Sequence, residues 1–391
     1  MIGALIMVKN EEESIHVTLN SIKDHIKHVI VVDTGSTDQT VNVIKNILKK
    51  NKQVLHLHKT LFTNFAVTRN ECIDFAESIA SNIGIKYLLL LDSGDEFVCK
   101  LRKLDLYQLL NKLTSNKWFG VVTKPWKVVN GIIDHYDIRF IKCYKNCRYD
   151  IQYPVHEIFA IKTYDNLFRF ENTFTLYQDR TKYGETSKAR FMKDIEMLLQ
   201  APKNNRNCYY LAKSYLDVLD YENAYKYFVE ALENMESKRE NIMYAIDDYT
   251  IIMCILNCIG HLDNTDNHEI TLNYIYRAIN VNKEIIDAYL FFFKYCIDNN
   301  CIDKTLPYLK IVENMNKPTD ITTMTTNHTY YDYLRWHLLS QIYLKTQNYT
   351  LGKEACKKAL LAQNNAIDQI NLQVLTNLEA NKNKELCNQD I

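Results

Sequence analysis

The chain has 391 residues with 47 basic and 47 acidic side chains, so its formal net charge is zero and no overall field favours nucleic acid or an anionic membrane. Hydrophobic residues make up 47% of the sequence and charged residues 24%, which excludes a mainly disordered or collagen-like polypeptide. Because a single core usually stops growing at about 250 to 300 residues, the length predicts two domains.

The start of the chain, MIGALIMVKNEEE, lacks a basic segment and a small-residue cleavage site, and it predicts a first strand rather than a signal peptide. The longest apolar runs, such as 88–91 and 251–256, are much shorter than the roughly 20 residues that span a bilayer. An odd number of cysteines without framework spacing favours a reducing compartment. We therefore expect a cytoplasmic protein without a membrane span, in the host cytoplasm if the Lys, Asn and Ile bias reflects a viral genome.

Short apolar runs alternate with segments of helical character in the first half of the chain. Strands are predicted at 2–8, 28–33, 53–58 and 86–91, and helices at 12–23, 38–50 and 66–81. This alternation implies right-handed crossovers and a Rossmann-like, mostly parallel sheet. Ligands of open α/β sheets bind beyond the carboxyl ends of the strands. The polar stretches that follow the strands are therefore the candidate site.

From about Thr186 onward the sequence consists of Tyr-rich and Leu-rich amphipathic helices. The spacing of a tetratricopeptide helix pair is matched by Leu211, Ala212, Tyr215, Ala224, Phe228 and Ala231. The same register returns more weakly at 291–308 and clearly at 336–359. We predict an α/β domain at 1–184 and an all-α, tetratricopeptide-like domain at 185–391, with a frayed tail after about 377. Such repeats form a concave surface suited to a peptide, a protein or a second copy of the chain in a homodimer.

Asp33 directly follows the apolar run HVIVV and precedes a turn and a predicted helix. A helix cap accounts for Ser36, Thr37 and Asp38, but it does not account for Asp33. A carboxylate at the end of a strand can accept the ring N–H of a nucleotide base. The small residues beside it, Gly35 among them, leave room for a flat ring.

Asp92 and Asp95 follow the apolar run LLLL within the segment DSGDEF. Carboxylate oxygens are the ligands that Mg²⁺ and Mn²⁺ prefer, and such ions commonly bridge carboxylates to a diphosphate. Gly94 would allow close approach of the backbone, and a plain acidic turn is the alternative interpretation. Arg69 and Asn70 would supply a cation and an amide for the same diphosphate, although a solvated arginine is the simpler explanation.

Four segments follow one another along the first half of the chain: VKNEE at 8–12, VVDTGSTDQT at 31–40, RNECIDFA at 69–76 and LLDSGDEF at 90–97. They closely resemble family 2 glycosyltransferases with the GT-A fold, above all members that carry tetratricopeptide repeats behind the catalytic domain. The resemblance covers roughly residues 1–180. It implies metal-dependent, inverting transfer of a sugar from a nucleotide-sugar, most often a UDP-sugar, to a protein, peptide or glycan acceptor.

The resemblance also implies residue roles. The nucleotide-sugar would be bound by Lys9, Asn10, Glu11, Asp33, Gly35, Arg69 and Asp92, with Asp33 at the base and Arg69 near the diphosphate. The family pattern is Asp-Ala-Asp followed by an acid, whereas here Gly94 stands at the second Asp and Asp95 comes one step later. We expect Asp95 to replace that Asp as a catalytic metal ligand for Mn²⁺ or Mg²⁺.

The segment RYDIQYPVHEIF places His156 and Glu157 where these relatives carry Val-His-Glu after an Arg-rich strand, here IRFIKCYKN. His156 would complete the metal shell with Asp92 and Asp95, and Glu157 would be the general base. A structural His-Glu pair is the plain alternative. Two other functions stay open: a repeat-based binding scaffold with a degenerate, inactive GT-A domain, and a nucleotidyltransferase, for which VKNEEE lacks the usual Gly-rich basic loop.

Overall fold

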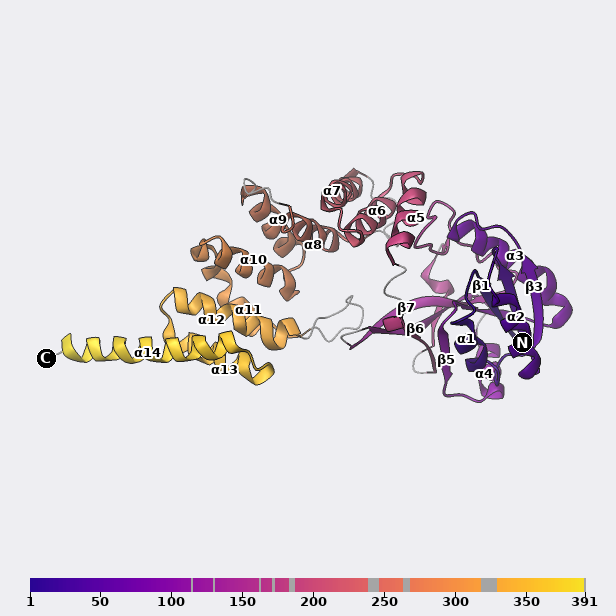
Figure 1. Ribbon diagram of the computed structural model, residues 1–391, viewed down its shortest axis with the longest axis horizontal. Helices are drawn as coiled ribbons and strands as arrows, with labels where there is room; N and C mark the ends of the chain where they lie inside the picture. Colours follow the sequence, from indigo (N-terminus) through magenta and orange to yellow (C-terminus); the bar gives the residue numbers. More distant parts are fainter. Residues whose placement is uncertain are drawn as a thin grey trace. The chain divides into compact units, whose positions relative to one another are not determined.

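The computed structural model describes residues 1–113, 115–128, 131–161, 163–170, 173–182, 187–237, 246–262, 268–317 and 329–389. The chain forms two compact units, Met1–Val218 and Leu219–Ile391 (Figure 1). The first combines a sheet with helices and the second is helical throughout its described part, which confirms the predicted fold class. Helices α5 (Ser187–Leu199) and α6 (Asn205–Asp217) belong to the first unit. The domain limit expected between 184 and 185 stays a prediction.

Four parallel strands form one half of the sheet, in the order β3-β2-β1-β4. They are β1 (Ile2–Val8), β2 (His28–Asp33), β3 (Val54–Lys59) and β4 (Tyr87–Leu91), and they are connected by α1 (Ile15–Ser21), α2 (Thr40–Lys50) and α3 (Phe65–Ile83). All seven elements lie within a few residues of their predicted positions. Val8 pairs with Asp33 and Ile6 with Leu91, so the polar segments after these three strands emerge at one edge of the sheet.

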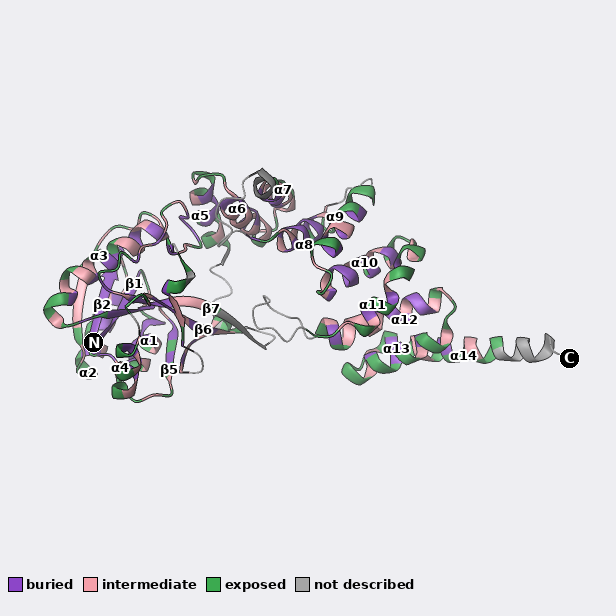
Figure 2. Cartoon of the chain, turned by 180° about the vertical axis from the view of Figure 1, so that it is seen from behind, coloured by how far each residue is buried: buried purple, intermediate pink, exposed green. Residues whose placement is uncertain are grey.

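The central strands have unbroken apolar sequences because both of their faces are covered. Every residue of β2 and β4 is buried, and so is every residue of β1 except Met7. Figure 2 shows β1 and β2 as buried strands, while α2 and α4 (Lys103–Asn111) carry exposed surface. This rigid layer fixes where the site loops begin.

The other half of the sheet contains antiparallel pairings, and the sequence analysis did not predict its strands. Its strands are β5 (Asp95–Cys99), β6 (Phe119–Val128), β7 (Gly131–Lys142), β8 (Leu167–Arg169) and β9 (Phe174–Asp179). β7 runs antiparallel to β4, and β6 lies between β7 and β9. Only the end of β7, Phe140–Lys142, pairs with β4, so the earlier part of β7 extends past the last residue of β4.

The described helices of the second unit pack on their neighbours in sequence. They include α7 (Tyr221–Ser237), α8 (Asp248–Ile259), α9 (His268–Val281), α10 (Ile286–Asp298), α11 (Leu309–Asn314), α12 (Arg335–Lys345), α13 (Tyr349–Ala362) and α14 (Ala366–Gln389). A Cβ on Gly352 of α13 would lie 2.9 Å from Leu375 Cδ2 of α14, so the two helices pack closely here and a larger residue would require the Leu375 side chain to shift. Within the described residues, every helix is too short or too polar to cross a bilayer.

Candidate active site

Asp33 lies at the carboxyl end of β2 with its side chain buried. Its Oδ1 accepts a 2.9 Å hydrogen bond from the backbone N–H of Ser36, and the hydrogen bonds of the described residues leave Oδ2 without a donor. Gly35 has a φ of +101°, a conformation that favours glycine, and a Cβ there would meet nothing within 4 Å. A carboxylate oxygen and an open turn are therefore available to a flat ring that donates a hydrogen bond.

Asn10 and Glu11 tie the loop after β1 to the loop after β2. Asn10 Oδ1 accepts from the backbone N–H of Thr37 at 2.8 Å, and the Asn10 N–H donates to Ser36 Oγ at 3.0 Å. The Glu11 N–H donates to Thr40 Oγ1 at 2.6 Å. Two loops far apart in sequence thus form one rigid rim. This rim carries five of the predicted donor-binding residues: Lys9, Asn10, Glu11, Asp33 and Gly35.

Ser14 connects this rim to the turn after β4. Its hydroxyl donates to Glu11 Oε2 at 2.5 Å and lies 2.7 Å from the Ser93 hydroxyl. Thr18 Oγ1 donates to the backbone carbonyl of Asp92 at 3.1 Å. The residues after β1, β2 and β4 therefore form a continuous hydrogen-bonded edge.

Gly94 shapes the acidic turn, which we define as residues 92–95. It has a φ of +86°, and the two aspartates bond each other's backbone across it. The Asp95 N–H donates to the Asp92 carbonyl at 3.2 Å, and the Asp92 N–H donates to Asp95 Oδ2 at 2.9 Å. The Asp95 side chain thus points inward, where it is 0% exposed, while that of Asp92 is 29% exposed.

Three cations surround the two carboxylates of the acidic turn. Lys124 Nζ lies 3.0 Å from Asp92 Oδ2, 2.9 Å from Asp95 Oδ1 and 3.2 Å from Asp95 Oδ2. Arg139 Nη2 lies 2.9 Å from Asp92 Oδ2, and Arg69 Nη2 lies 2.9 Å from Asp92 Oδ1. All four carboxylate oxygens are therefore in contact with a cationic group. The Lys124 side chain is only 2% exposed, so this ion cluster is buried around its ammonium.

This cluster changes the pKa values of the two aspartates. Burial acts against ionisation of Asp92, but Arg139, Lys124 and Arg69 together hold its pKa well below the ordinary value. Burial raises the pKa of Asp95, with Lys124 opposing and the charge of Asp92 reinforcing that change. Asp92 is therefore the carboxylate that stays firmly ionised at neutral pH.

Sequence reasoning did not single out Lys124 and Arg139. A signal existed for Lys124, because strand alternation puts Gly120, Val122 and Lys124 on one face of β6 and all three are buried. A lysine at a core position needs a buried partner. Arg139 directly precedes Phe140, which pairs with Leu89 of β4, and it is the residue at which the register between β6 and β7 shifts. Local sequence does not reveal these pairings.

Arg69 joins the acidic turn to Glu157. Its Nε lies 2.5 Å from Glu157 Oε1 while its Nη2 contacts Asp92. Burial and the charges of these two carboxylates act on the guanidinium in opposite directions, and the net result is a raised pKa for Arg69. The structure thus brings Arg69, Asp92, Asp95 and Glu157 into one network. Asn70, in contrast, is used internally: its side-chain amide bonds the backbone of Tyr149 in both directions, at 2.9 and 2.8 Å.

His156 packs away from the two aspartates. Its ring stacks on Tyr210 of α6 with centroids 3.9 Å apart, and its carbonyl accepts a 3.0 Å hydrogen bond from Arg206 Nη2. The pKa of His156 is lowered to about 3, first by desolvation against its neighbours and then by the charges of Arg206, Arg190, Arg180 and Lys213, although the residue as a whole is exposed. Asn207 Nδ2 donates to the Gln152 carbonyl at 2.9 Å, so α6 holds the segment that carries His156 and Glu157.

These residues do not form an open metal site. Across the part of the chain that the structure describes, no three His, Cys, Asp or Glu side chains are grouped so that they could hold a metal ion. The expected set of Asp92, Asp95 and His156 is not brought together, because Asp95 turns inward to Lys124 and His156 stacks on Tyr210. The donor atoms present therefore do not fit Mn²⁺ or Mg²⁺ as ligands.

Comparison with solved structures gives distant likenesses only. TarS residues 1–349 from S. aureus is 13% identical, with 84% of this chain and 97% of that chain covered and a TM-score of 0.31. YrrB, a TPR protein with an unusual peptide-binding site, is 14% identical over 48% of this chain and 86% of that chain, with a TM-score of 0.35. Glucosyl-3-phosphoglycerate synthase from Mycobacterium tuberculosis, in complex with Mn²⁺, UDP and glucosyl-3-phosphoglycerate, is 16% identical over 32% and 44%, with a TM-score of 0.22.

Comparison with sequences is more specific. No curated protein matches the chain. Residues 4–117, which include most of β1, β2 to β5, the rim and the acidic turn, match the family model for glycosyl transferase family 2. The motifs singled out in the sequence from Lys9 to Asp95 lie within that match. Residues 4–117 are therefore a glycosyl transferase family 2 domain, and the described chain from α5 onward is helical.

Proposed function

We propose that this enzyme transfers a sugar from a UDP-sugar to an acceptor hydroxyl with inversion at the anomeric carbon. One observation carries the proposal: the carboxylate of Asp33, whose Oδ2 has no donor among the described hydrogen bonds, and the cations at the acidic turn lie on the same hydrogen-bonded edge of the sheet. A nucleoside diphosphate has the matching parts, a ring N–H at one end and two phosphates at the other.

Donor binding is assigned to both ends of this edge. Asp33 Oδ2 would accept the uracil ring N–H, with the base lying over the open turn at Gly35. The side chains of Arg69 and Arg139 are 16% and 11% exposed, and a guanidinium suits phosphate oxygens because its donors form a planar fork. Lys9, Asn10 and Glu11 would border the nucleotide from the rim.

The chemistry needs one base and one stabilised leaving group. The acceptor oxygen forms a bond to the anomeric carbon, the bond from that carbon to the phosphate oxygen breaks, and the acceptor proton moves to Glu157. Positive charge fixed at the acidic turn would stabilise the negative charge that develops on the departing UDP. Arg69 contacts Asp92 and Glu157 through different nitrogens, so one guanidinium would orient both halves of the reaction.

The acceptor is proposed to be a protein, peptide or glycan bound with help from the helical repeats, which are also the proposed surface for a homodimer. The resemblance implies Mn²⁺ or Mg²⁺ as a cofactor. The carboxylates of Asp92 and Asp95 are already in contact with Lys124, Arg69 and Arg139, and we assign no step to a metal.

Calorimetric titration with UDP and with GDP tests the donor site. UDP should bind the full chain, and Asp33→Ala should weaken it by at least about tenfold, because a hydrogen bond to a charged group is lost. Asp24→Ala, an exposed aspartate after α1, is the matched control and should bind as the wild type does. Release of UDP from a panel of UDP-sugars then identifies the sugar. If neither nucleotide binds at millimolar concentration, the donor site is refuted and the binding scaffold becomes the better hypothesis.

A further inference from the structure

Lys124 lies where a divalent cation would have to lie to bridge the carboxylates of the acidic turn. We propose that this domain binds its donor diphosphate without a metal ion, and that the ammonium of Lys124, with Arg69 and Arg139, supplies the positive charge instead. The inference rests on the proposed function, because it concerns how the same donor is held.

The contacts of Lys124 resemble those of a bound cation. An ammonium has three N–H donors and no acceptor, and Nζ lies within 3.2 Å of three carboxylate oxygens from two residues. The fourth oxygen, Asp92 Oδ1, is held by Arg69. A hard divalent ion requires carboxylate oxygens at about 2.0 to 2.6 Å. The cluster offers it no oxygen that is free of a cationic partner.

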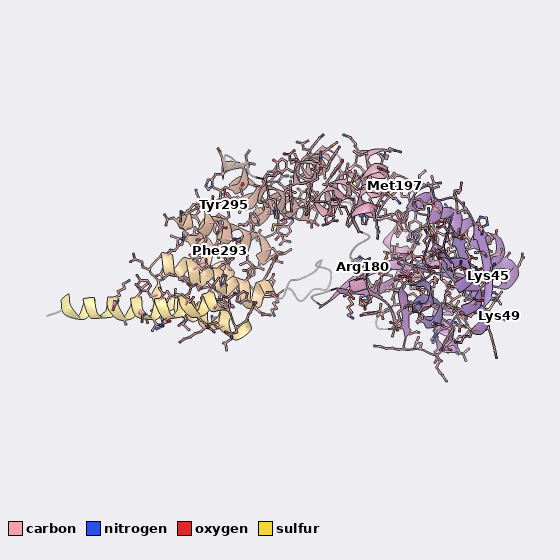
Figure 3. All side chains as sticks on the ribbon, viewed as in Figure 1. Lys45, Lys49, Arg180, Met197, Phe293 and Tyr295 are labelled. Carbon is pink, nitrogen blue, oxygen red and sulfur yellow. The ribbon has the colours of Figure 1, made fainter. Side chains whose placement is uncertain are left out.

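If a metal ion displaced the ammonium of Lys124 from the two carboxylates, that ammonium would remain in the interior without a partner. The lysine stands on the buried face of β6, and its side chain is 2% exposed. An unpaired buried charge is strongly unfavourable. A further cation interacts with the same carboxylates. Arg180 (Figure 3) lies with its guanidinium carbon 3.4 Å from the centroid of the Trp126 ring. The charges of Asp92 and Asp95 act on this guanidinium and favour its charged form. A second positive ion would therefore enter a region whose negative charge is already balanced.

The strand itself provides a matched pair of lysines. Lys124 and Lys127 both belong to β6, but Lys127 is 48% exposed and pairs with Asp179 at 3.2 Å instead of with the acidic turn. Lys127→Gln therefore reports the effect of removing a lysine from this strand without touching the cluster. Lys124→Gln removes the ammonium and leaves Asp92 and Asp95 facing each other with fewer cations.

The experiment is UDP titration of the full chain in EDTA and again in Mn²⁺. Wild-type and Lys127→Gln protein should bind UDP equally in both buffers, within about threefold. Lys124→Gln should lose at least about tenfold in EDTA, because one positive charge beside the diphosphate is removed, and should recover in Mn²⁺ because two carboxylates become available to the ion. Manganese electron paramagnetic resonance without UDP should detect a bound ion only in Lys124→Gln.

The outcomes separate the two proposals. Wild-type binding of UDP that requires Mn²⁺ overturns the metal-free inference and leaves the proposed function intact. Lys124→Gln that binds UDP in EDTA as tightly as the wild type also overturns it, since the lysine is then only structural. Absence of UDP binding in both buffers overturns the proposed function itself. If Lys124→Gln does not fold, as judged by circular dichroism, the wild-type comparison of the two buffers still decides.

Discussion

The side chain of Asn70 exchanges two hydrogen bonds with the backbone of Tyr149, with distances of 2.9 and 2.8 Å. Asn70 lies on α3 next to Arg69, and Tyr149 begins the segment that leads to Glu157. This pair therefore fixes the spacing between a donor-site cation and the proposed base, although neither residue belongs to the ion cluster.

Asn70→Ala should lower the free energy of unfolding by about 1 to 3 kcal/mol, because a partly buried backbone N–H and carbonyl lose their partner. Its effect on catalysis should appear in kcat more than in UDP affinity, since Glu157 would shift while Asp33 would not. Urea unfolding and steady-state kinetics measure the two effects. Asn42→Ala, an amide on α2 bonded only to Gln39 in the described contacts, is the control. Equal loss of UDP affinity and kcat in Asn70→Ala would contradict this division of roles.

Arg69→Met should destabilise the fold by up to about 3 kcal/mol, because Asp92 and Glu157 lose a shared partner in a largely buried network. The loss should be smaller with Arg69→Lys, whose single ammonium can reach one carboxylate but cannot bridge both. Chemical denaturation of the two variants makes the comparison. Arg102→Met provides the reference, since Arg102 pairs with Asp105 on the surface with its side chain 85% exposed. If Arg102→Met lowers the free energy of unfolding as much as Arg69→Met does, the contacts of Arg69 with both Asp92 and Glu157 do not stabilise the fold.

His156 should make the fold sensitive to acid. Its folded pKa is lowered from 6.5 to about 3, so below pH 6.5 the unfolded chain takes up a proton that the folded chain excludes. Stability should therefore fall as pH decreases from about 6.5 toward 3, by less than the full pKa shift would give, because His156 is exposed and solvent screens its charge. His156→Asn suits the positive φ of +52° and should flatten this part of the profile.

Urea unfolding at intervals between pH 7 and pH 4 measures that slope. Asp92 adds little to that slope, because the stability from its depressed pKa is fully present above the unfolded value of 3.8 and is lost only as the pH falls below it. The comparison of wild type with His156→Asn removes what remains of this shared part. His16→Asn, on an exposed position of α1, should keep the wild-type profile. Parallel profiles for wild type and His156→Asn would show that the imidazole can ionise in the folded protein.

Gly94→Ala should destabilise the chain by about 1 to 2 kcal/mol, because φ of +86° is unfavourable for a residue with a Cβ. It should also weaken UDP binding, since the turn that directs Asp95 onto Lys124 would relax. Gly260→Ala is the control: it lies at the end of α8 with φ of −64°, and its nearest Cβ contact is 3.5 Å. Thermal melts and UDP titration of both variants test this, and a Gly94→Ala protein indistinguishable from Gly260→Ala would refute the role of the turn.

The parallel half of the sheet was predictable because fully covered strands leave continuous apolar runs such as LLLL before Asp92. Strand ends also located Asp33 and Asp92 correctly at one edge. The second half of the sheet was not predictable in this way, because β6 and β7 mix polar with apolar residues, and because β7 pairs with β4 and β6 with β9 across long stretches of sequence. Lys124 and Arg139 come from those strands and were missed for that reason.

The predicted metal set shows a different limit. Asp92, Asp95 and His156 were grouped by resemblance, but the direction of a side chain depends on local backbone geometry and on packing. The positive φ of Gly94 turns Asp95 inward, and stacking on Tyr210 of α6 holds the His156 ring away from the two aspartates. Neither effect is visible in the spacing of these residues.

The contacts of α6 with the segment from Gln152 to His156 determine where this chain can be joined to repeats from another protein. Arg206, Asn207 and Tyr210 lie beyond the expected end of the α/β domain, yet they hold the segment that precedes the proposed base. A crossover at residue 184 would exchange these three side chains for foreign ones. Grafting of new repeats onto this transferase should therefore succeed only when the junction falls after Val218, so that α5 and α6 are inherited with the catalytic domain.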